Sequence, residues 1–521
     1  MEKLKAFQLE IFNKLLASIP EEMGVVLKRS AFSPNIRERA DFSCALFDAK
    51  GELVSQASHI PVHLGAMPET MKEILPLFDW KEEDIVITND PFSGGTHLPD
   101  ITLIKPFFYQ GKLLFFLLVR AHHSDVGGKV PGSMGLCESL EDEGIRILPT
   151  YLCREGRLNE AFLMDFLKKV RNPYEREGDF RAMFTALERG KVRLEELLKR
   201  YSQETLFEAI EALKNYSEKA FLELLKRMKK GVFTFIDYLD SDGYENIDIP
   251  IRVKIHLTED EVVADFRENP SQVRGPVNAP RAVTVSASYY VFIALLNTLG
   301  EFPINQGIFR RIKVLTKPKT VVSAEYPAPV SAGNVETSQR IVDVLLGALH
   351  EAIPELIPAA SCGSMNNISF GNEEWAYYET IGGGMGARPG KDGLSAVHTH
   401  MTNTMNTPIE ALEQAFPVRI DRYAIRRGSG GEGKFRGGDG IIREYLFLEP
   451  MVVSLLTDRR RHGPYGLKGG FPGEPGKNYL IKKGIEKIEL SNKITFKVEP
   501  GDKVRIETPG GGGFEKKTRY Y

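Results

Sequence analysis

The 521-residue sequence has few cysteines, no long apolar run and no excess of charge of one sign. Its four cysteines, Cys44, Cys137, Cys153 and Cys362, are scattered without a CxxC pair, which argues against a disulfide framework and favours a reduced, cytoplasmic protein. The apolar run from Leu113 to Val119 is only seven residues long. A helix that spans a bilayer needs roughly 20, so we expect no membrane span.

The charge balance and the N-terminal residues bear on the partners of the protein and on whether it carries a signal peptide. A formal net charge of −2 gives no reason to expect a nucleic acid or a membrane surface as a partner. Residues 1–20 contain Glu2 and Glu10 and no continuous apolar segment, so we expect an amphipathic helix there instead of a signal peptide. At this length the chain should form several packed units instead of one core.

Hydrophobic periodicity predicts a multi-domain α+β protein. We expect a β-rich N-terminal region with a metal site, a helical segment, a mixed α+β central region and a β-rich C-terminal domain with glycine-rich loops. The predicted boundaries are 1–155, 156–232, 233–417 and 418–521. Helices are expected over 1–30, 68–77, within 157–230 and over 284–299, and strands over 42–47, 53–57, 84–89, 101–108, 113–120, 233–239 and 251–266.

Histidine is concentrated in one short stretch, because five of the ten histidines lie between residues 59 and 123. Two polar clusters, Thr96–Asp100 and Ala121–Gly128, flank a predicted hairpin that turns at Gln110 and Gly111. Cross-strand neighbours lie roughly 4.5–5.5 Å apart, so the two clusters should meet at the open end of the hairpin.

The turn also predicts the register of this hairpin, with Pro99 opposite His122 and Asp100 opposite Ala121. We predict that His97, Asp100 and His122 bind one divalent metal ion. Two imidazoles and one carboxylate suit Zn²⁺, Mn²⁺ or Fe²⁺ and leave coordination positions open for water or substrate. The alternative is that these side chains are a polar cap on the hairpin.

Five further residues near the clusters are candidates for the active site. Asp90, His123 and Asp125 are expected to orient the imidazoles instead of binding the ion. For His123 the reason is that neighbouring strand residues point to opposite faces of a sheet. His59 and His63 either line the same cavity or are ordinary loop histidines.

Two glycine-rich runs resemble nucleotide-binding loops only superficially. Gly428–Lys434 fits GxxxxGK, but Phe435 stands where a phosphate loop needs Ser or Thr. The strand predicted over 441–446 follows where a helix N-terminus should hold the phosphates. Gly382–Gly386 has no βαβ unit around it. We therefore expect no nucleotide site in this chain.

Several long motifs resemble the hydantoinase B/oxoprolinase family, and the resemblance covers essentially the whole chain. In the acetone carboxylase branch of that family, a His-x-x-Asp and a downstream His hold the metal, and these correspond to His97, Asp100 and His122. The matching motifs lie at residues 38–44, 59–67, 89–100, 122–128, 273–279, 331–337, 402–404 and 505–513.

The resemblance implies a subunit of a hetero-oligomer whose partner is a hydantoinase A-type, actin-like subunit that binds and uses ATP. This chain would then be the metal-binding catalytic subunit of a hydantoinase- or 5-oxoprolinase-like amidohydrolase, which opens a cyclic amide after phosphoryl activation on the partner. Two alternatives stay open: the α-type subunit of an ATP-dependent ketone carboxylase, and a non-catalytic scaffold subunit with a structural metal.

Overall fold

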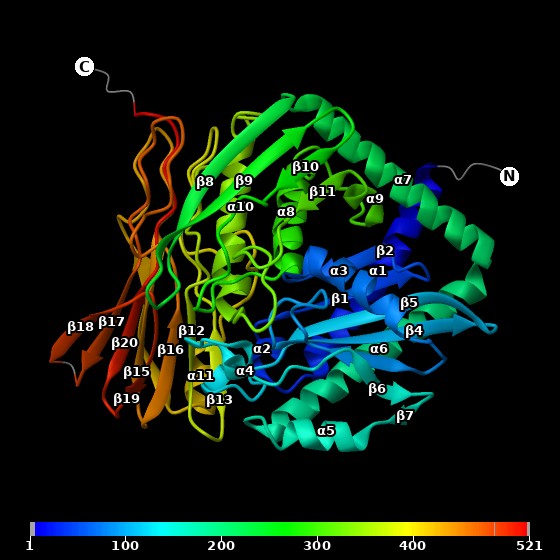
Figure 1. Cartoon of the computed structure of the whole chain (residues 1–521), viewed down its shortest axis with the longest axis horizontal. Helices are drawn as coiled ribbons and strands as arrows, with labels where there is room; N and C mark the ends of the chain where they lie inside the picture. The colour runs from blue at the N-terminus through cyan, green and yellow to red at the C-terminus, as the bar shows by residue number, and fades with distance from the viewer. Residues whose placement is uncertain (1–5, 484, 518–521) are drawn as a thin grey trace.

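Helices alternate with strands that form several sheets, which confirms the predicted multi-domain α+β class. The structure is a computed structural model that describes residues 6–483 and 485–517. Figure 1 shows the N-terminal sheet in blue and cyan, a second sheet in green, and the C-terminal strands in orange and red. Among the described residues, no helix is both long and apolar enough to cross a membrane.

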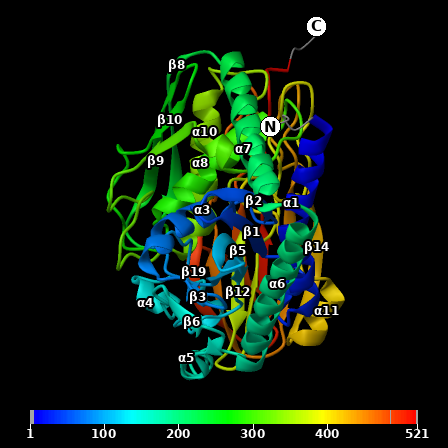
Figure 2. The ribbon, with the colours of Figure 1, turned by 90° about the vertical axis from the view of Figure 1, so that its right-hand side faces the viewer.

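The N-terminal sheet is antiparallel, has the strand order β2-β1-β5-β4-β3-β6-β7, and is buried on both faces. Along its interior strand β5, Phe115 and Leu117 pack into a core with residues of helices α1 and α6. Figure 2 shows these two helices side by side. Phe116 and Leu118 alternate with them and pack into a second core with helices α3 and α8. The strands are β1 Phe42–Asp48, β2 Leu53–Ser58, β3 Ile85–Thr88, β4 Asp100–Tyr109, β5 Lys112–His122, β6 Thr150–Arg154 and β7 Arg157–Leu158.

The longer helices of the first half lie in the predicted ranges, apart from residues 1–5, which lie outside the described residues. The short helices α2 and α4 were not predicted, and one predicted helix begins at another residue. The helix predicted to begin at Pro68 begins at His63, and Pro68 lies inside it. Burial favours this longer helix, because Gly65 allows close contact with Ser286 of helix α8 and donates its backbone N–H to the Ser286 hydroxyl at 3.0 Å. The helices are α1 Ala6–Ser30, α2 Pro34–Arg37, α3 His63–Ile74, α4 Leu140–Glu143, α5 Glu160–Leu167, α6 Pro173–Arg200 and α7 Gln203–Arg227, with 3-10 turns at Leu75–Leu77 and Pro131–Ser133.

The second sheet has the order β11-β10-β9-β8 and packs against helices α8 and α10. The single strand predicted over 251–266 is wrong, because the chain reverses after Thr258 and forms two antiparallel strands. The elements here are β8 Gly231–Ser241, β9 Ile247–Leu257, β10 Val262–Asp265, α8 Arg281–Leu296, α9 Gln306–Phe309, β11 Ile312–Leu315, a π-helical turn Gly333–Thr337 and α10 Ser338–Leu349.

Two sheets form the C-terminal part around a third hydrophobic core. Their strand orders are β13-β12-β16-β19 and β14-β15-β20-β17-β18. Strand β12, which precedes residue 418, therefore pairs with β16, which follows it, and β13 joins the same sheet through β12. The elements are β12 Asn367–Gly371, β13 Ala376–Glu379, α11 Ile409–Ala415, β14 Val418–Arg426, β15 Gly440–Phe447, β16 Met451–Leu456, β17 Lys477–Lys482, β18 Glu486–Leu490, β19 Lys493–Val498 and β20 Lys503–Glu507.

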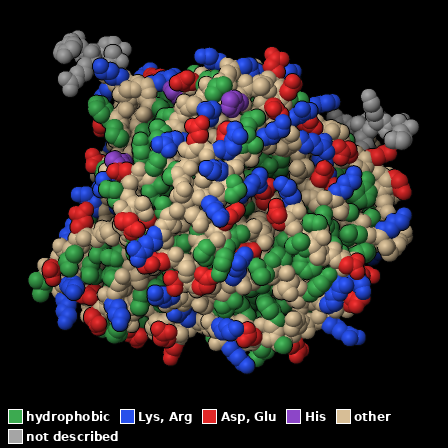
Figure 3. Space-filling model, viewed as in Figure 1, with side chains coloured by type: hydrophobic (Ala, Val, Ile, Leu, Met, Phe, Trp, Pro, Cys, Tyr) green, Lys and Arg blue, Asp and Glu red, His purple; other side chains and the backbone are tan. Residues whose placement is uncertain are grey.

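Long glycine-rich loops extend from these sheets and pack backbone against backbone. A Cβ atom on Gly386 would lie 1.8 Å from the Ala359 carbonyl oxygen, and one on Gly510 would lie 1.9 Å from that of Ser429. Only glycine fits such contacts, which accounts for the glycine-rich composition of the region. On the face shown in Figure 3, positive and negative side chains are interspersed, in keeping with the small net charge.

Candidate metal centre

The hairpin of β4 and β5 brings the two polar clusters together, but its register differs by one residue from the predicted one. Asp100, not Pro99, pairs with His122. The cause is an irregularity between Phe107 and Phe108, near the turn. It shifts by one residue every pair that lies farther from the turn, up to Asp100 and His122. The shift places the Asp100 carboxylate directly across from the His122 imidazole.

His97, Asp100 and His122 form a compact, buried cluster, and each is at most 2% exposed. His97 Nε2 lies 3.2 Å from His122 Nδ1, and His97 Nδ1 lies 3.1 Å from Asp100 Oδ2. Asp100 Oδ1 is 3.6 Å from His122 Nδ1. One ligand atom from each residue lies within 4.8 Å of the others. Two nitrogens that bind one tetrahedral zinc ion at roughly 2.0–2.1 Å lie about 3.3 Å apart, so the spacing suits a shared ion.

Unpartnered polar atoms in the cluster support the same conclusion. Asp100 Oδ1, His122 Nε2 and His97 Nδ1 are buried and make no hydrogen bond to the described residues. For His97 Nδ1, the contact with Asp100 is close but lacks hydrogen-bond geometry. Buried polar atoms without partners are rare in native proteins and point to an ion or a water. The nitrogen and carboxylate donors therefore fit a divalent cation.

The surroundings of the cluster favour the protonation states that bind metal. Burial alone would raise the pKa of Asp100, but His97, His63 and His122 outweigh burial and hold that pKa well below its ordinary value. Burial lowers the pKa of His122, although Asp41 and Asp100 oppose the shift. A carboxylate and a neutral imidazole result, and both have lone pairs for a cation.

Asp100 is also fixed by two neighbours on its other side. His63, at the start of α3, places Nε2 3.2 Å from Asp100 Oδ2, and its Nδ1 lies 2.9 Å from the Ser43 hydroxyl. The Thr96 hydroxyl donates a hydrogen bond to the same Asp100 oxygen. We expected His63 either to line the cavity or to be an ordinary loop histidine. The structure favours the first alternative, because His63 lines the cavity beside Asp100.

A cavity of about 20 Å³ adjoins the cluster. A single water needs roughly 10–15 Å³, so this space suits an ion or one water. Its lining adds residues that sequence reasoning missed, among them Asp41, whose Oδ2 lies 3.8 Å from His122 Nδ1. The apolar lining residues are Ile60, Val62, Val335, Met365 and Met401, and the polar ones outside the cluster are Asp41, His63, Asn334, Tyr378, Thr380, Thr402 and Thr404.

Two histidines predicted near the site lie away from its cavity. His123 packs on the other face of the sheet, with Nε2 3.5 Å from Met183 Sδ and its ring 4.9 Å from that of Phe180. The His59 ring lies 4.7 Å from that of Phe42 and does not line the cavity. The structure thus brings His63 to the cluster but not His59 or His123.

Asp90 and Asp125 bind arginines instead of imidazoles. Asp90 accepts hydrogen bonds from Arg146 at 2.9 and 3.1 Å. Asp125 accepts one from Arg171 at 3.0 Å and one from the Gly132 backbone at 3.1 Å. These contacts shape the loops on either side of the ligands, so neither carboxylate makes the hydrogen bond to an imidazole that we expected.

The GxxxxGK run connects two strands. It follows β14, and β15 begins at Gly440 with no helix between them. Gly430 packs against the backbone of Gly437, and Gly433 packs against Phe514. A helix N-terminus that could hold phosphates is therefore lacking at this loop.

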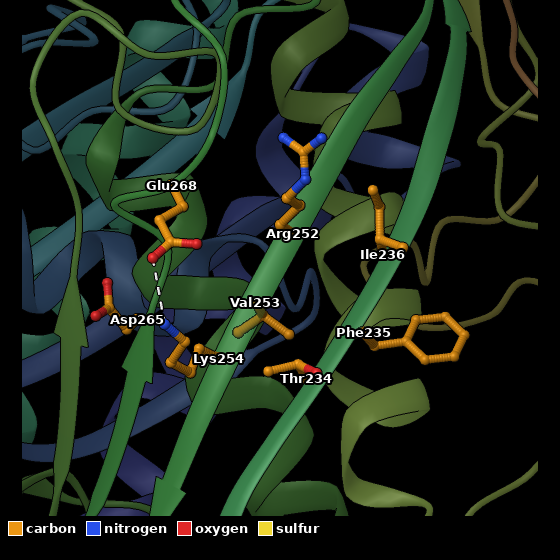
Figure 4. Close-up of a pocket in the computed structure, with 8 residues that line it drawn as sticks. All are labelled: Thr234, Phe235, Ile236, Arg252, Val253, Lys254, Asp265 and Glu268. Carbon is orange, nitrogen blue, oxygen red and sulfur yellow. Dashed lines mark hydrogen bonds and ion pairs between the residues drawn. The ribbon is translucent and has the colours of Figure 1, made fainter.

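A larger hollow of about 390 Å³ lies elsewhere, across strands β8, β9 and β10 (Figure 4). It is an open groove in which Lys254 pairs with Glu268 at 3.2 Å. It contains no histidine, whereas the smaller cavity has the metal-ligating side chains. The groove has the larger volume, but of the two hollows it is the cavity that is lined by side chains able to bind a metal ion. We therefore take the cavity as the candidate site.

Comparison with known proteins identifies the family. The sequence pattern described as Hydantoinase B/oxoprolinase matches residues 5–517. The chain belongs to the hydantoinase B/oxoprolinase family. This confirms the resemblance seen in the sequence motifs, and the relatives of this chain include proteins named as 5-oxoprolinases and as a hydantoinase subunit.

Three hydantoinase B/oxoprolinase relatives show the range of chain lengths. The chain is 42% identical to an uncharacterised protein of Methanocaldococcus jannaschii, over 97% of this chain and 90% of that protein. It is 31% identical to a putative D-/L-hydantoinase subunit, of the B type, from a Pseudomonas species, over 99% and 90%. It is 36% identical to the 5-oxoprolinase of Dictyostelium discoideum, over 99% of this chain but only 41% of that protein. The chain thus spans about two-fifths of the length of that 5-oxoprolinase.

Two solved structures share the fold of this hydantoinase B/oxoprolinase chain. The ATP-dependent caprolactamase from Pseudomonas jessenii superimposes with a TM-score of 0.91 at 28% identity, over 99% of this chain and 92% of that chain. Acetone carboxylase in a nucleotide-free state superimposes with a TM-score of 0.87 at 18% identity, over 97% and 75%. The second likeness shows the fold alone.

Proposed function

We propose that this chain is the metal-binding catalytic subunit of an ATP-dependent hydrolase that opens a cyclic amide. The supporting observation is the buried cluster of His97, Asp100 and His122, in which each residue has one polar atom without a hydrogen-bond partner, in a chain of the hydantoinase B/oxoprolinase family. An actin-like partner would use ATP to phosphorylate the amide oxygen. Water would then add to the activated carbon, and the ring C–N bond would break as the nitrogen takes up a proton and leaves as an amine. A second water would hydrolyse the resulting acyl phosphate to a carboxylate and inorganic phosphate.

The metal and the protein residues have separate tasks in this proposal. A divalent ion would supply a Lewis acid that polarises a carbonyl or phosphoryl oxygen and lowers the pKa of water. His63 and Thr96 hold Asp100 Oδ2, so that Oδ1 stays free to bind a cation. The apolar side chains of Met365 and Met401 exclude bulk water, which strengthens electrostatic interactions in the cavity.

The partner is proposed because an unstrained amide needs activation and the glycine loop of this chain lacks the parts of a phosphate site. One relative is named a hydantoinase subunit, and the caprolactamase is named as ATP-dependent. The carboxylase alternative rests on shared fold only. The scaffold alternative would require an ion bound by four protein ligands. The cavity lining offers Asp41 as a further carboxylate, 3.8 Å from His122 Nδ1.

The proposal predicts that this chain, co-purified with its actin-like partner, opens cyclic amides only when ATP is present. Ring-opened product and ADP would be measured with 5-oxoproline, hydantoin, N-methylhydantoin and caprolactam, and a ketone with bicarbonate would be the competing assay. His122→Ala should abolish product formation. A carboxylated ketone as the main product would favour the carboxylase alternative, and wild-type turnover that survives His122→Ala would contradict a catalytic role for the cluster.

A second prediction concerns the chain alone, which we expect not to bind ATP with micromolar affinity. Phe435 occupies the position of the Mg²⁺-binding hydroxyl, and the loop leads into a strand. Isothermal titration calorimetry of the isolated chain with Mg²⁺-ATP would test this. A saturable micromolar site would show that nucleotide binding does not need the partner.

A further inference from the structure

Tyr378 lies against the face of the His122 imidazole, although nothing in the sequence around it predicted this contact. It comes from strand β13, far along the chain from the histidine hairpin. Its ring stacks on the His122 imidazole with 4.8 Å between centroids and 7° between planes. Tyr378 is 1% exposed and His122 2% exposed, so solvent does not compete for this contact.

The tyrosine is itself held by a chain of buried hydrogen bonds. Its hydroxyl donates to Asn367 Oδ1 at 2.7 Å. The Asn367 amide in turn donates to Glu336 Oε1 at 2.7 Å and to the Leu456 carbonyl at 2.6 Å. This chain connects the ring to the π-helical turn and to strand β16. The ring therefore cannot tilt without breaking hydrogen bonds that have no solvent to replace them.

Arg39 holds the backbone of the same residue. Its Nη1 donates to the Tyr378 carbonyl at 2.7 Å, and its guanidinium carbon lies 4.9 Å from the centre of the Tyr378 ring. Arg39 also lies 3.8 Å from Asp41, and Asp41 lies 3.8 Å from His122. Both ends of Tyr378 are thus fixed to the surroundings of the cluster.

We infer that Tyr378 is a positioning residue, which sets the plane of the His122 imidazole for metal binding. A metal ion bonds to an imidazole nitrogen in the plane of the ring, so the orientation of that plane decides where the ion can sit. The contact with His97 leaves His122 Nε2 free and does not by itself fix the plane. The Tyr378 ring, which stacks on His122 and is held by its own hydrogen bonds, fixes that plane. This inference rests on the proposed metal function.

The test compares metal affinity in Tyr378→Phe and Tyr378→Leu. The first keeps the stacked ring but loses the bond to Asn367, and the second loses both. Zn²⁺ affinity would be measured by competition with a chromophoric chelator, and the visible absorption of bound Co²⁺ would report ligand geometry. We expect affinity to fall by about 3–10-fold in Tyr378→Phe and by about 10–100-fold in Tyr378→Leu, the range typical of residues that orient metal ligands. The Co²⁺ spectrum of the leucine variant should change.

The adjacent Tyr377 offers a matched control. It is equally buried on the same strand, but its hydroxyl bonds to Thr407 at 2.9 Å and its ring packs into the C-terminal core. Tyr377→Phe should therefore lower the thermal midpoint of unfolding without changing Zn²⁺ affinity.

The outcomes separate this inference from the proposed function. Wild-type affinity in Tyr378→Phe would overturn the role of the anchored ring, even if Tyr378→Leu does not fold. A loss of affinity in Tyr377→Phe as large as that in Tyr378→Phe would show that both effects come from lost stability, and would also overturn it. Wild-type protein that binds no divalent ion would overturn the proposed function, and this inference with it.

Discussion

Asp100→Asn and His122→Ala should each abolish tight binding of one divalent ion per chain. Asparagine keeps the shape of Asp100 but removes the charge that attracts the cation, and alanine removes an imidazole donor. We expect affinity to fall by more than the roughly 10–100-fold typical of residues that only orient ligands. Elemental analysis after dialysis against a weak chelator would measure the metal content of each purified variant.

His123→Ala is the matched control for these variants. His123 is adjacent in sequence and equally buried, but it packs against Met183 and Phe180 on the opposite face of the sheet. Burial holds its pKa well below the ordinary value, so it adds no charge to the cluster. Its variant should retain metal. Equal metal content in His122→Ala and wild type would refute the ligand assignment, and loss of metal only in His123→Ala would transfer that role to His123.

The location of the cluster was predictable because its signal is local. The histidine motifs flank two apolar runs joined by a tight turn, and such a pattern allows few structures other than a hairpin. The exact register was not predictable. The irregularity at Phe107 and Phe108 has no marker in the sequence, since both residues suit a regular strand, yet it moves Asp100 opposite His122.

Residues that reach the site from distant segments were not predictable from their own neighbourhoods. Asp41 lies within a motif used to identify the family, but nothing around it indicates that it lies 3.8 Å from His122. Tyr378 resembles an ordinary strand residue. Helix α10 was missed although its apolar residues gather on one side. Its polar side is buried as well, because Arg340 pairs with Asp343 and Asp458 in the interior, and no local signal shows that such charged residues lie inside the protein.

Proximity in sequence also led to a wrong expectation for two carboxylates. Asp90 and Asp125 lie beside the ligand motifs, and their type suits a partner for imidazole. Their carboxylates instead pair with Arg146 and Arg171, which approach from other segments. A sequence places a carboxylate near a site, but the tertiary partners decide which way it points.

Glu336 leads to a second prediction with a large effect, a loss of stability as the pH rises. Burial, reinforced by the Asp458 carboxylate, raises the pKa of Glu336 from 4.5 to about 8. The folded state then holds the proton more tightly than the unfolded state. The stabilisation is therefore complete below about pH 4.5, declines as the pH rises, and is lost above about pH 8. The steepest decline is about 1.4 kcal/mol per pH unit.

Glu336→Gln should remove this part of the pH dependence, because glutamine is neutral at every pH and keeps the oxygen that accepts from Met365 and Asn367. Thermal midpoints at pH 5, 6, 7 and 8 would test it. The advantage of the variant over wild type should grow with pH, whereas the same change at Glu373, whose side chain is 98% exposed, should leave the profile unchanged. Parallel profiles for Glu336→Gln and wild type would mean that Glu336 ionises at its ordinary pKa, with a counter-charge or water supplied to its buried carboxylate.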